Sequence, residues 1–221
     1  MEGGLQCFAR AASEAGACGA LELRAVALLE TGSALAHRAA NRRHDEAIPA
    51  LQEAIDLAQH LGSGSIAGRA CYELAWIAFL ESRYERVEYW ASQALEHGGD
   101  DPEVRAAVGA VRGKAYSEVG RYGAAIAILR PAERDAEATQ DAFKITWVLA
   151  ALGRVLMLRG SFDEARPILE RAVDIALRAG LVGFAPCPES YLGELCRLTD
   201  ETDRAESLLD QHSFPNRKSV V

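Results

Sequence analysis

A pattern of small residues that recurs about every 40 residues constrains the fold of this chain more than any other feature of its sequence. The recurring residues are Ala47, Val87, Ala125, Ala165 and Ala205, so the spacings are 40, 38, 40 and 40 residues. Self-similarity at a period of this length is typical of proteins built from stacked helical repeats. The sequence therefore predicts a series of similar units.

Each unit has the pattern of two helices joined by a tight turn. A second small residue precedes the recurring one by 12 positions, and we expect the two to face each other where the helices cross. These pairs are Ala75 with Val87, Gly113 with Ala125, Gly153 with Ala165 and Gly193 with Ala205, and a fainter unit has Leu35 before Ala47. Because one helix pair leaves an apolar face open, stacking of neighbouring pairs is expected to complete the core.

Turn and cap residues fit this register. Gly120 and Gly160 stand where a helix end needs a left-handed residue. Asp45 and Asp163 are expected to cap the second helices of their pairs, and Asp101 to cap a helix that begins at Pro102. The glycine-rich stretches 62–65, 98–102 and 180–183 are interpreted as linkers between successive pairs.

The pattern resembles the tetratricopeptide repeat over residues 25 to 212. The seven positions of that motif are matched twice, by Gly113, Tyr116, Gly120, Tyr122, Ala125, Leu129 and Ala132, and by Gly153, Leu156, Gly160, Phe162, Ala165, Leu169 and Ala172. The period of about 40 residues exceeds the 34 of the family. The family's tryptophan early in the first helix is absent, and no proline closes the second helix. The longer units resemble those of bacterial MalT-like and large LuxR-type regulators and related signalling ATPases.

The resemblance implies an all-α fold, a right-handed α-solenoid of about five antiparallel helix pairs in a single domain. We expect an N-terminal helix or cap at residues 1–20 and a tail at 213–221. The expected helix pairs are 22–61, 65–98, 102–138, 141–180 and 186–212.

Composition limits the classes of partner. The formal net charge of −8 argues against a nucleic-acid surface, which needs clustered Lys and Arg. No apolar run approaches the roughly 18 residues that span a bilayer, and no signal peptide is recognisable, so we expect a soluble, cytoplasmic protein without membrane contact. Five cysteines without a CxxC motif are interpreted as reduced, buried thiols.

No motif for catalysis, cofactor binding or metal binding occurs, and the expectation is a non-enzyme without cofactor or metal. The acidic pairs Asp100-Asp101 and Asp163-Glu164 stand at turns and helix starts, where capping accounts for them. His37 and His44 with Asp45 are interpreted as a solvated turn rather than a ligand cluster.

In tetratricopeptide arrays the first helices line a concave groove that binds peptides, and the resemblance places a set of residues there. They are Arg69, Tyr72, Glu73, Trp76 and Phe79, then Lys114, Ser117 and Glu118, then Trp147, Arg154 and Met157, and finally Ser190, Tyr191, Glu194 and Arg197. Aromatic anchors near Arg and Lys are typical of binding hot spots. The hypothesis is a partner anchored by Trp76 and Phe79, with an acidic group near Lys114 and Arg154.

The competing interpretation is that the aromatic residues belong to the core between helix pairs. The leading function is a protein- or peptide-binding scaffold or adaptor in regulation or complex assembly. The alternative is the ligand- or peptide-sensing region of a bacterial transcriptional regulator or signalling ATPase, which requires a longer parent chain. Self-association through the end faces of the solenoid is compatible with both.

Overall fold

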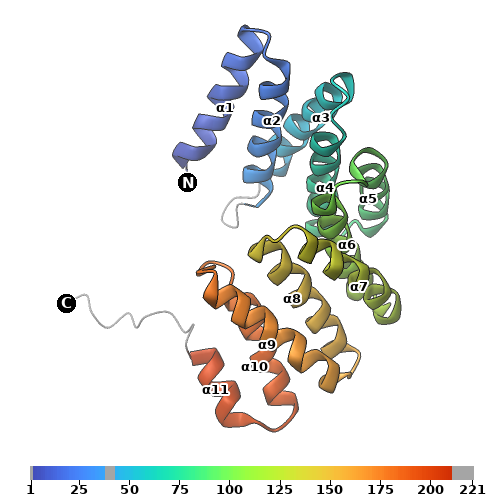
Figure 1. Ribbon diagram of the computed structural model, residues 1–221, viewed down its shortest axis with the longest axis vertical. Coiled ribbons are helices and arrows are strands. Elements are labelled where there is room, and N and C mark those ends of the chain that lie inside the picture. The colour runs from blue at the N-terminus through green and yellow to red at the C-terminus, as the bar shows by residue number, and fades with distance from the viewer. Residues whose placement is uncertain (1, 38–42, 211–221) are drawn as a thin grey trace, which may run out of the picture. The chain divides into compact units, whose positions relative to one another are not determined.

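The computed structural model describes residues 2–37 and 43–210, and in this part of the chain all regular structure is α-helical (Figure 1). Eleven helices follow one another with short connections, and no strand occurs among the described residues. The predicted all-α helical-repeat fold is therefore confirmed. The tail predicted at residues 213–221 lies outside the described residues.

The chain forms two compact units, residues 1–115 and 116–221, which we call unit 1 and unit 2. Unit 1 contains α1 (Glu2–Ala17), α2 (Leu21–Ala36), α3 (His44–His60), α4 (Gly64–Leu80), α5 (Tyr84–Gly98) and most of α6 (Pro102–Glu118). Unit 2 contains the end of α6, then α7 (Tyr122–Ala138), α8 (Ala142–Leu158), α9 (Phe162–Arg178), α10 (Pro186–Leu198) and α11 (Thr202–Asp210).

Packing within each unit follows the order of the helices along the chain. In unit 1, α1 packs on α2, α2 on α3, α3 on α4 and α4 on α5, and α2 also contacts α4. In unit 2 each helix from α7 to α11 packs on the next, and α8 also contacts α10. The first helices of neighbouring pairs therefore lie against each other in both units, and their side chains share one face.

Glycines mark the closest helix crossings. A Cβ atom on Gly153 of α8 would lie 2.5 Å from Cγ of Leu169 on α9, and one on Gly32 of α2 would lie 2.5 Å from Cγ of Leu51 on α3. Gly32 therefore holds the place that Leu35 was predicted to hold. That prediction was wrong by three residues, because α2 and α3 are joined by seven residues whereas α8 and α9 are joined by three.

A second glycine contact joins α4 and α5. A Cβ atom on Gly64 would lie 2.2 Å from the carbonyl oxygen of His97, and one on Gly68 would lie 2.9 Å from Cα of Gly98. The backbones of the two helices thus touch directly. Gly64 and Gly98 are helical residues at this crossing, which corrects their interpretation as linker residues.

The middle residue of most three-residue connections has a positive φ. Gly120 and Gly160 have φ values of 74° and 84°, which confirms the predicted left-handed helix ends. Ser82 and Asp200 occupy the same position in their turns, with φ values of 58° and 61°. Since a side chain is disfavoured in this region, the fold imposes the turn even where the sequence lacks glycine.

Two of the three predicted caps are wrong in detail. Asp101 accepts a hydrogen bond from the backbone N–H of Glu103 at 2.8 Å, which confirms a cap ahead of α6. Asp45 and Asp163 are instead the second residues of α3 and α9. The residues before those helices make no side-chain cap, so the two carboxylates act only through their charge near the positive helix end.

The cysteines are less uniformly buried than expected. All five are free thiols, and Cys71 and Cys196 are buried, with burial raising the pKa of Cys71 to about 12. Cys187 is half-buried, whereas Cys7 and Cys18 on α1 and at its end are exposed. The expectation of buried thiols is therefore wrong for α1. No helix in the described part of the chain is long and apolar enough to cross a bilayer.

Candidate partner-binding site

Unit 2 gathers three of the proposed groove residues from successive first helices. Arg154 on α8 donates a hydrogen bond from Nη1 to Oε1 of Glu118, the last residue of α6, at 2.9 Å. Tyr191 on α10 is half-buried, and burial raises the pKa of its hydroxyl to about 12. Cys187 and Glu118 also raise this pKa, whereas the charge of Arg154 lowers it. The ion pair and the phenol therefore form one polar cluster on this face.

Beside this face three aromatic rings form what we call the aromatic patch, made of Phe143, Trp147 and Phe184. The ring centroids of Phe143 and Trp147 lie 6.1 Å apart, and Phe184 lies 5.1 Å from Phe143 and 5.5 Å from Trp147. Phe143 is 45% exposed, and Val182, near Phe184 in sequence, is 82% exposed. The rings thus pack on one another and still present apolar surface to solvent.

Local structure fixes the two rings on α8. Asp141 caps the helix by accepting hydrogen bonds from the backbone N–H groups of Phe143 at 2.8 Å and Lys144 at 3.2 Å. Burial alone would raise the pKa of Asp141, but its bonds to Lys144 and Phe143 lower the pKa below the usual value. Since Phe143 and Trp147 are four residues apart on the helix that this cap starts, they lie on the same face.

Phe184 comes from the connection between α9 and α10. Gly180 there has a φ of 66°, and the backbone N–H of Phe184 donates to the carbonyl of Leu181 at 2.8 Å. These turns hold the Phe184 ring against α8. From the sequence, residues 180–183 are interpreted as a linker, and Phe143 and Phe184 have no predicted role, because apolar residues outside the repeat register carry no positional signal.

In unit 1 the proposed groove residues Glu73 and Trp76 lie under His37. Glu73 is 8% exposed and accepts hydrogen bonds from Ser33 Oγ at 2.8 Å and from His37 Nε2 at 3.0 Å. The His37 ring also stacks on Trp76, with centroids 5.6 Å apart and an interplanar angle of 15°. Trp76 is 9% exposed, so most of its indole is covered within the chain.

The remaining aromatic and charged residues of this face in unit 1 are also engaged. Phe79 stacks on Trp76 at 5.3 Å, and Arg69 on α4 donates to Glu30 on α2 at 3.0 Å. Burial, followed by the charge of Glu73, raises the pKa of Tyr72. Lys114, on α6, is half-buried.

The other proposed residues of unit 2 are divided between core and surface. Ser117 and Met157 are buried, at 4% and 8% exposure. Ser190 is exposed and donates to the carbonyl of Cys187 at 2.8 Å. Glu194 and Arg197 pair with each other at 2.7 Å, one turn apart on α10, and that contact lowers the pKa of Glu194.

The solvated turn expected at His37 and His44 includes residues 38–42, which lie outside the described residues, but both histidines contact carboxylates of the second helix pair. His37 contacts Glu73 and Trp76 on α4, and His44 Nδ1 lies 3.2 Å from Oε1 of Glu81, which caps the C-terminus of the same helix. Each histidine thus joins the first helix pair to the second. Their partners lie 36 and 37 residues away in sequence, which explains why local spacing did not reveal them.

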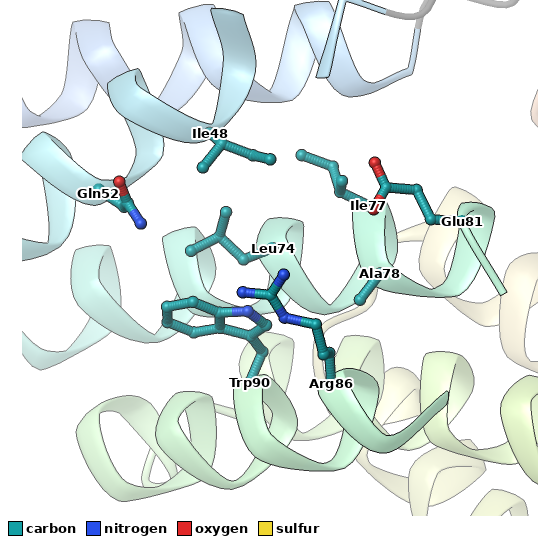
Figure 2. A pocket seen from close by; sticks show the side chains of 8 residues that line it. All are labelled: Ile48, Gln52, Leu74, Ile77, Ala78, Glu81, Arg86 and Trp90. Atoms are coloured by element: carbon teal, nitrogen blue, oxygen red, sulfur yellow. The ribbon is translucent and has the colours of Figure 1, made fainter. Parts of the chain in front are cut away.

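A small cavity lies between α3, α4 and α5, and none of the proposed groove residues lines it (Figure 2). Its lining is Ile48, Gln52, Leu74, Ile77, Ala78, Glu81, Arg86 and Trp90. Figure 2 shows Arg86 and Trp90 side by side, both reaching from α5 toward the cavity. The cavity measures about 30 Å³, which suits one or two water molecules and is about a tenth of the smallest ligand pockets.

The described residues bring no three His, Cys, Asp or Glu side chains together in a way that could hold a metal ion. The acidic pairs noted in the sequence have structural partners. Asp101 caps α6 and accepts a hydrogen bond from Ser65 at 2.6 Å. Glu164 pairs with Arg159 at 3.0 Å. Asp101 and Glu164 thus have a capping role and an ion-pairing role in the fold.

Comparison with known proteins gives the class. Residues 148–182, which cover most of α8 and all of α9, match the family model of the tetratricopeptide repeat. This match identifies the α8–α9 helix pair as a tetratricopeptide repeat, which the sequence predicted for this pair. None of the curated proteins compared with the chain is similar to it in sequence. The finer resemblance to MalT-like and LuxR-type regulators stays a prediction.

A solved structure agrees with this chain in fold. The crystal structure of aspartyl phosphate phosphatase F from Bacillus subtilis superposes with a TM-score of 0.66 at 13% identity, over 86% of this chain and 51% of that one. This chain thus spans about half the length of that protein, and at this identity the likeness shows the fold alone. Nearly identical TPR-like repeats of a kinesin light chain from Podosopora anserina give a TM-score of 0.43 at 17% identity, over 94% of this chain and 92% of that one.

Proposed function

We propose that the chain binds a segment of another protein through the first-helix face of unit 2, in regulation or complex assembly, and that it works by binding rather than by catalysis. The observation that carries this proposal is the aromatic patch. Phe143, at 45% exposure, is held next to Trp147 and Phe184 and cannot be covered by its own neighbours. Exposed rings that are rigidly packed are the usual anchors of a protein interface.

The second helices of unit 2 offer a less suitable surface. Their charges pair across neighbouring helices: Arg171 on α9 with Glu133 on α7 at 3.3 Å, and Arg204 on α11 with Glu170 on α9 at 2.6 Å. A partner on that face would have to break these pairs and desolvate both charges. The first-helix face is therefore the better candidate for contact.

The neighbouring polar cluster supplies the chemistry of the partner. An apolar side chain of the partner, such as Leu, Met or Phe, would pack on the aromatic patch. An acidic group would accept a hydrogen bond from another N–H group of Arg154, whose bond to Glu118 uses Nη1, with Tyr191 alongside. This retains for Arg154 the acidic anchor that the sequence analysis placed near Lys114 and Arg154, and confines the proposed site to one unit.

Selection of peptides from a random phage-displayed library on the immobilised chain tests the proposal. We expect selected peptides to share an apolar residue, and Phe143→Ala to weaken their binding by about tenfold or more, as loss of a hot-spot ring does. Tyr89→Ala is the matched control, because Tyr89 is a ring on α5 that is at least as exposed as Phe143, at 58% against 45%. Equal loss in both variants, or no loss in Phe143→Ala, would refute the proposed site.

A further inference from the structure

Glu73 is a buried carboxylate at the contact between α2 and α4. It lies at the middle of α4, is 8% exposed, and accepts hydrogen bonds from Ser33 Oγ at 2.8 Å and His37 Nε2 at 3.0 Å. A buried negative charge requires a cation or several donors to offset its desolvation. Among the described residues, His37 is the group hydrogen-bonded to Glu73 that can carry the opposite charge.

His37 lies between this carboxylate and an aromatic face. Its ring stacks on Trp76 with a centroid distance of 5.6 Å while its Nε2 contacts Glu73. A cation held by a carboxylate on one side and an indole on the other has both favourable interactions that proteins offer to Lys and Arg side chains. The arrangement is that of a cation subsite with an imidazole in it.

The imidazole is the least constrained member of this arrangement. Its side chain is 42% exposed at the C-terminal cap of α2, whereas that of Glu73 is 10% exposed. Rotation of the His37 side chain into solvent would free Oε2 of Glu73 and the part of the Trp76 ring that the imidazole stacks on, without moving a helix. Glu73 would keep its bond from Ser33, and Trp76 would keep its stacking on Phe79 at 5.3 Å.

We propose that Glu73 and Trp76 form a subsite for a Lys or Arg side chain of a partner peptide, and that His37 occupies this subsite in the free protein. The inference deepens the proposed function and rests on it, since it assigns the cation to a peptide. Arg69, one turn earlier on α4, does not fill the subsite because it donates to Glu30 at 3.0 Å. The net charge of −8 also favours the approach of a basic partner.

The charge of His37 regulates competition for the subsite. Glu73 faces it from α4, Ser33 from its own helix carries no charge, and His44 of the adjoining α3 contacts Glu81 instead. Burial lowers the pKa of His37, but the hydrogen bond and charge of Glu73 outweigh this and raise the pKa above 6.5. A basic ligand therefore binds more tightly as the pH rises through that pKa, because neutral His37 releases Glu73 more easily.

Titration of the full chain with N-acetyl-arginine amide, followed by the indole N–H signal of Trp76 in NMR spectra at pH 8, tests the inference. The signal is assigned from its loss in Trp76→Phe. The matched neutral probe is N-acetyl-citrulline amide, which has nearly the same shape without the charge. We expect the arginine probe to shift the Trp76 signal in a saturable way, and the citrulline probe to leave it unchanged.

Two variants separate the subsite from a structural role. His37→Ala removes the occupant and is expected to tighten binding of the arginine probe by about fivefold, the effect of removing a partly exposed ion pair. Glu73→Gln, checked for native helicity by circular dichroism, is expected to abolish it. Equal shifts with both probes, or unchanged affinity in His37→Ala, would overturn the inference. Because the probe is not a peptide and Trp76 is in unit 1, that failure leaves the Phe143→Ala result in unit 2 unaffected.

Discussion

Gly153 is the residue at which the closest approach of α8 and α9 can be tested with one methyl group. A Cβ atom there would lie 2.5 Å from Cγ of Leu169, a side chain that is 0% exposed. We expect Gly153→Ala to lower the free energy of unfolding by about 1–3 kcal/mol, the usual cost of overpacking a core. Thermal or urea unfolding followed by circular dichroism measures the change.

The matched control for this substitution is Gly123→Ala. Gly123 lies in the first turn of α7, and a Cβ atom there would meet no atom within 4 Å. This variant should be as stable as the parent or slightly more stable, because alanine favours helix more than glycine does. Similar destabilisation by both substitutions would show that the effect comes from helix propensity or the unfolded state and not from the crossing.

His37 gives the stability of the chain a pH dependence with a definite sign. Its pKa in the folded protein is raised above 6.5 by Glu73, so its ion pair stabilises the fold fully below pH 6.5. The contribution is lost as the pH rises through the raised pKa. Melting temperatures of the parent and His37→Gln, measured from pH 5.5 to 8.5, should converge toward the alkaline end. A constant difference across this range would contradict the assigned ion pair.

At the scale of single residues the sequence predicted the core better than the site. The recurring small residues Ala47, Val87, Ala125 and Ala165 are all 0% exposed, because a helix crossing leaves a strict positional record in sequence. Contacts between side chains on neighbouring pairs leave no such record. The pairing of His37 with Glu73 depends on residues 36 positions apart and on the length of the α2–α3 connection.

At the scale of secondary-structure elements, the start of α8 shows how much an N-terminal cap contributes to stability. Asp141 bonds two backbone N–H groups, whereas Asp163 lies inside the first turn of α9 and caps nothing. We expect Asp141→Ala to cost about 1 kcal/mol of stability and Asp163→Ala only a few tenths, from the loss of a charge near the helix end. Chemical denaturation of both variants measures this difference, and equal losses would contradict the cap assignment.

In the turn between α7 and α8, a substitution is expected to stabilise the chain. Gln140 lies between α7 and α8 with a φ of 55°, in the left-handed region that Gly62 and Gly160 occupy in their own turns. Gln140→Gly is expected to stabilise the chain by up to about 1 kcal/mol, because glycine has no Cβ strain in this region. Gln93→Gly, in the middle of α5, is expected to lower the stability of the chain by about as much, because glycine disfavours a helix interior. A lower melting temperature for Gln140→Gly would contradict the assigned strain.

Helices and turns were predictable as elements because each has a local chemical signature. Gly120 and Gly160 predicted two turns, and Asp101 with Pro102 predicted the start of α6. The connection before α10 was interpreted as a linker because Gly180 and Gly183 dominate it. Its Phe184 ring acquires a role only when α8 places Phe143 and Trp147 beside it.

For the whole molecule, division into two units predicts that a destabilising substitution in one unit affects mainly the helices near it. In a repeat protein each helix pair contacts only its neighbours, so stability is close to a sum of local contributions. Hydrogen exchange of Gly153→Ala, measured by mass spectrometry, should increase mainly in α8, α9 and α10 and much less in α1 to α4. A uniform increase along the chain would indicate one cooperative unit and contradict this view.

In evolutionary terms, the crossing of α4 and α5 is a place where the sequence cannot drift one position at a time. Any residue other than glycine at 64 would bring a Cβ atom to 2.2 Å from the carbonyl oxygen of His97, and one at 68 would bring a Cβ atom to 2.9 Å from Cα of Gly98. A flexible side chain can yield to a new neighbour, but two backbones cannot unless the helices separate. Homologous chains should therefore keep Gly64, Gly68 and Gly98 together, or replace them together with a more widely spaced helix pair.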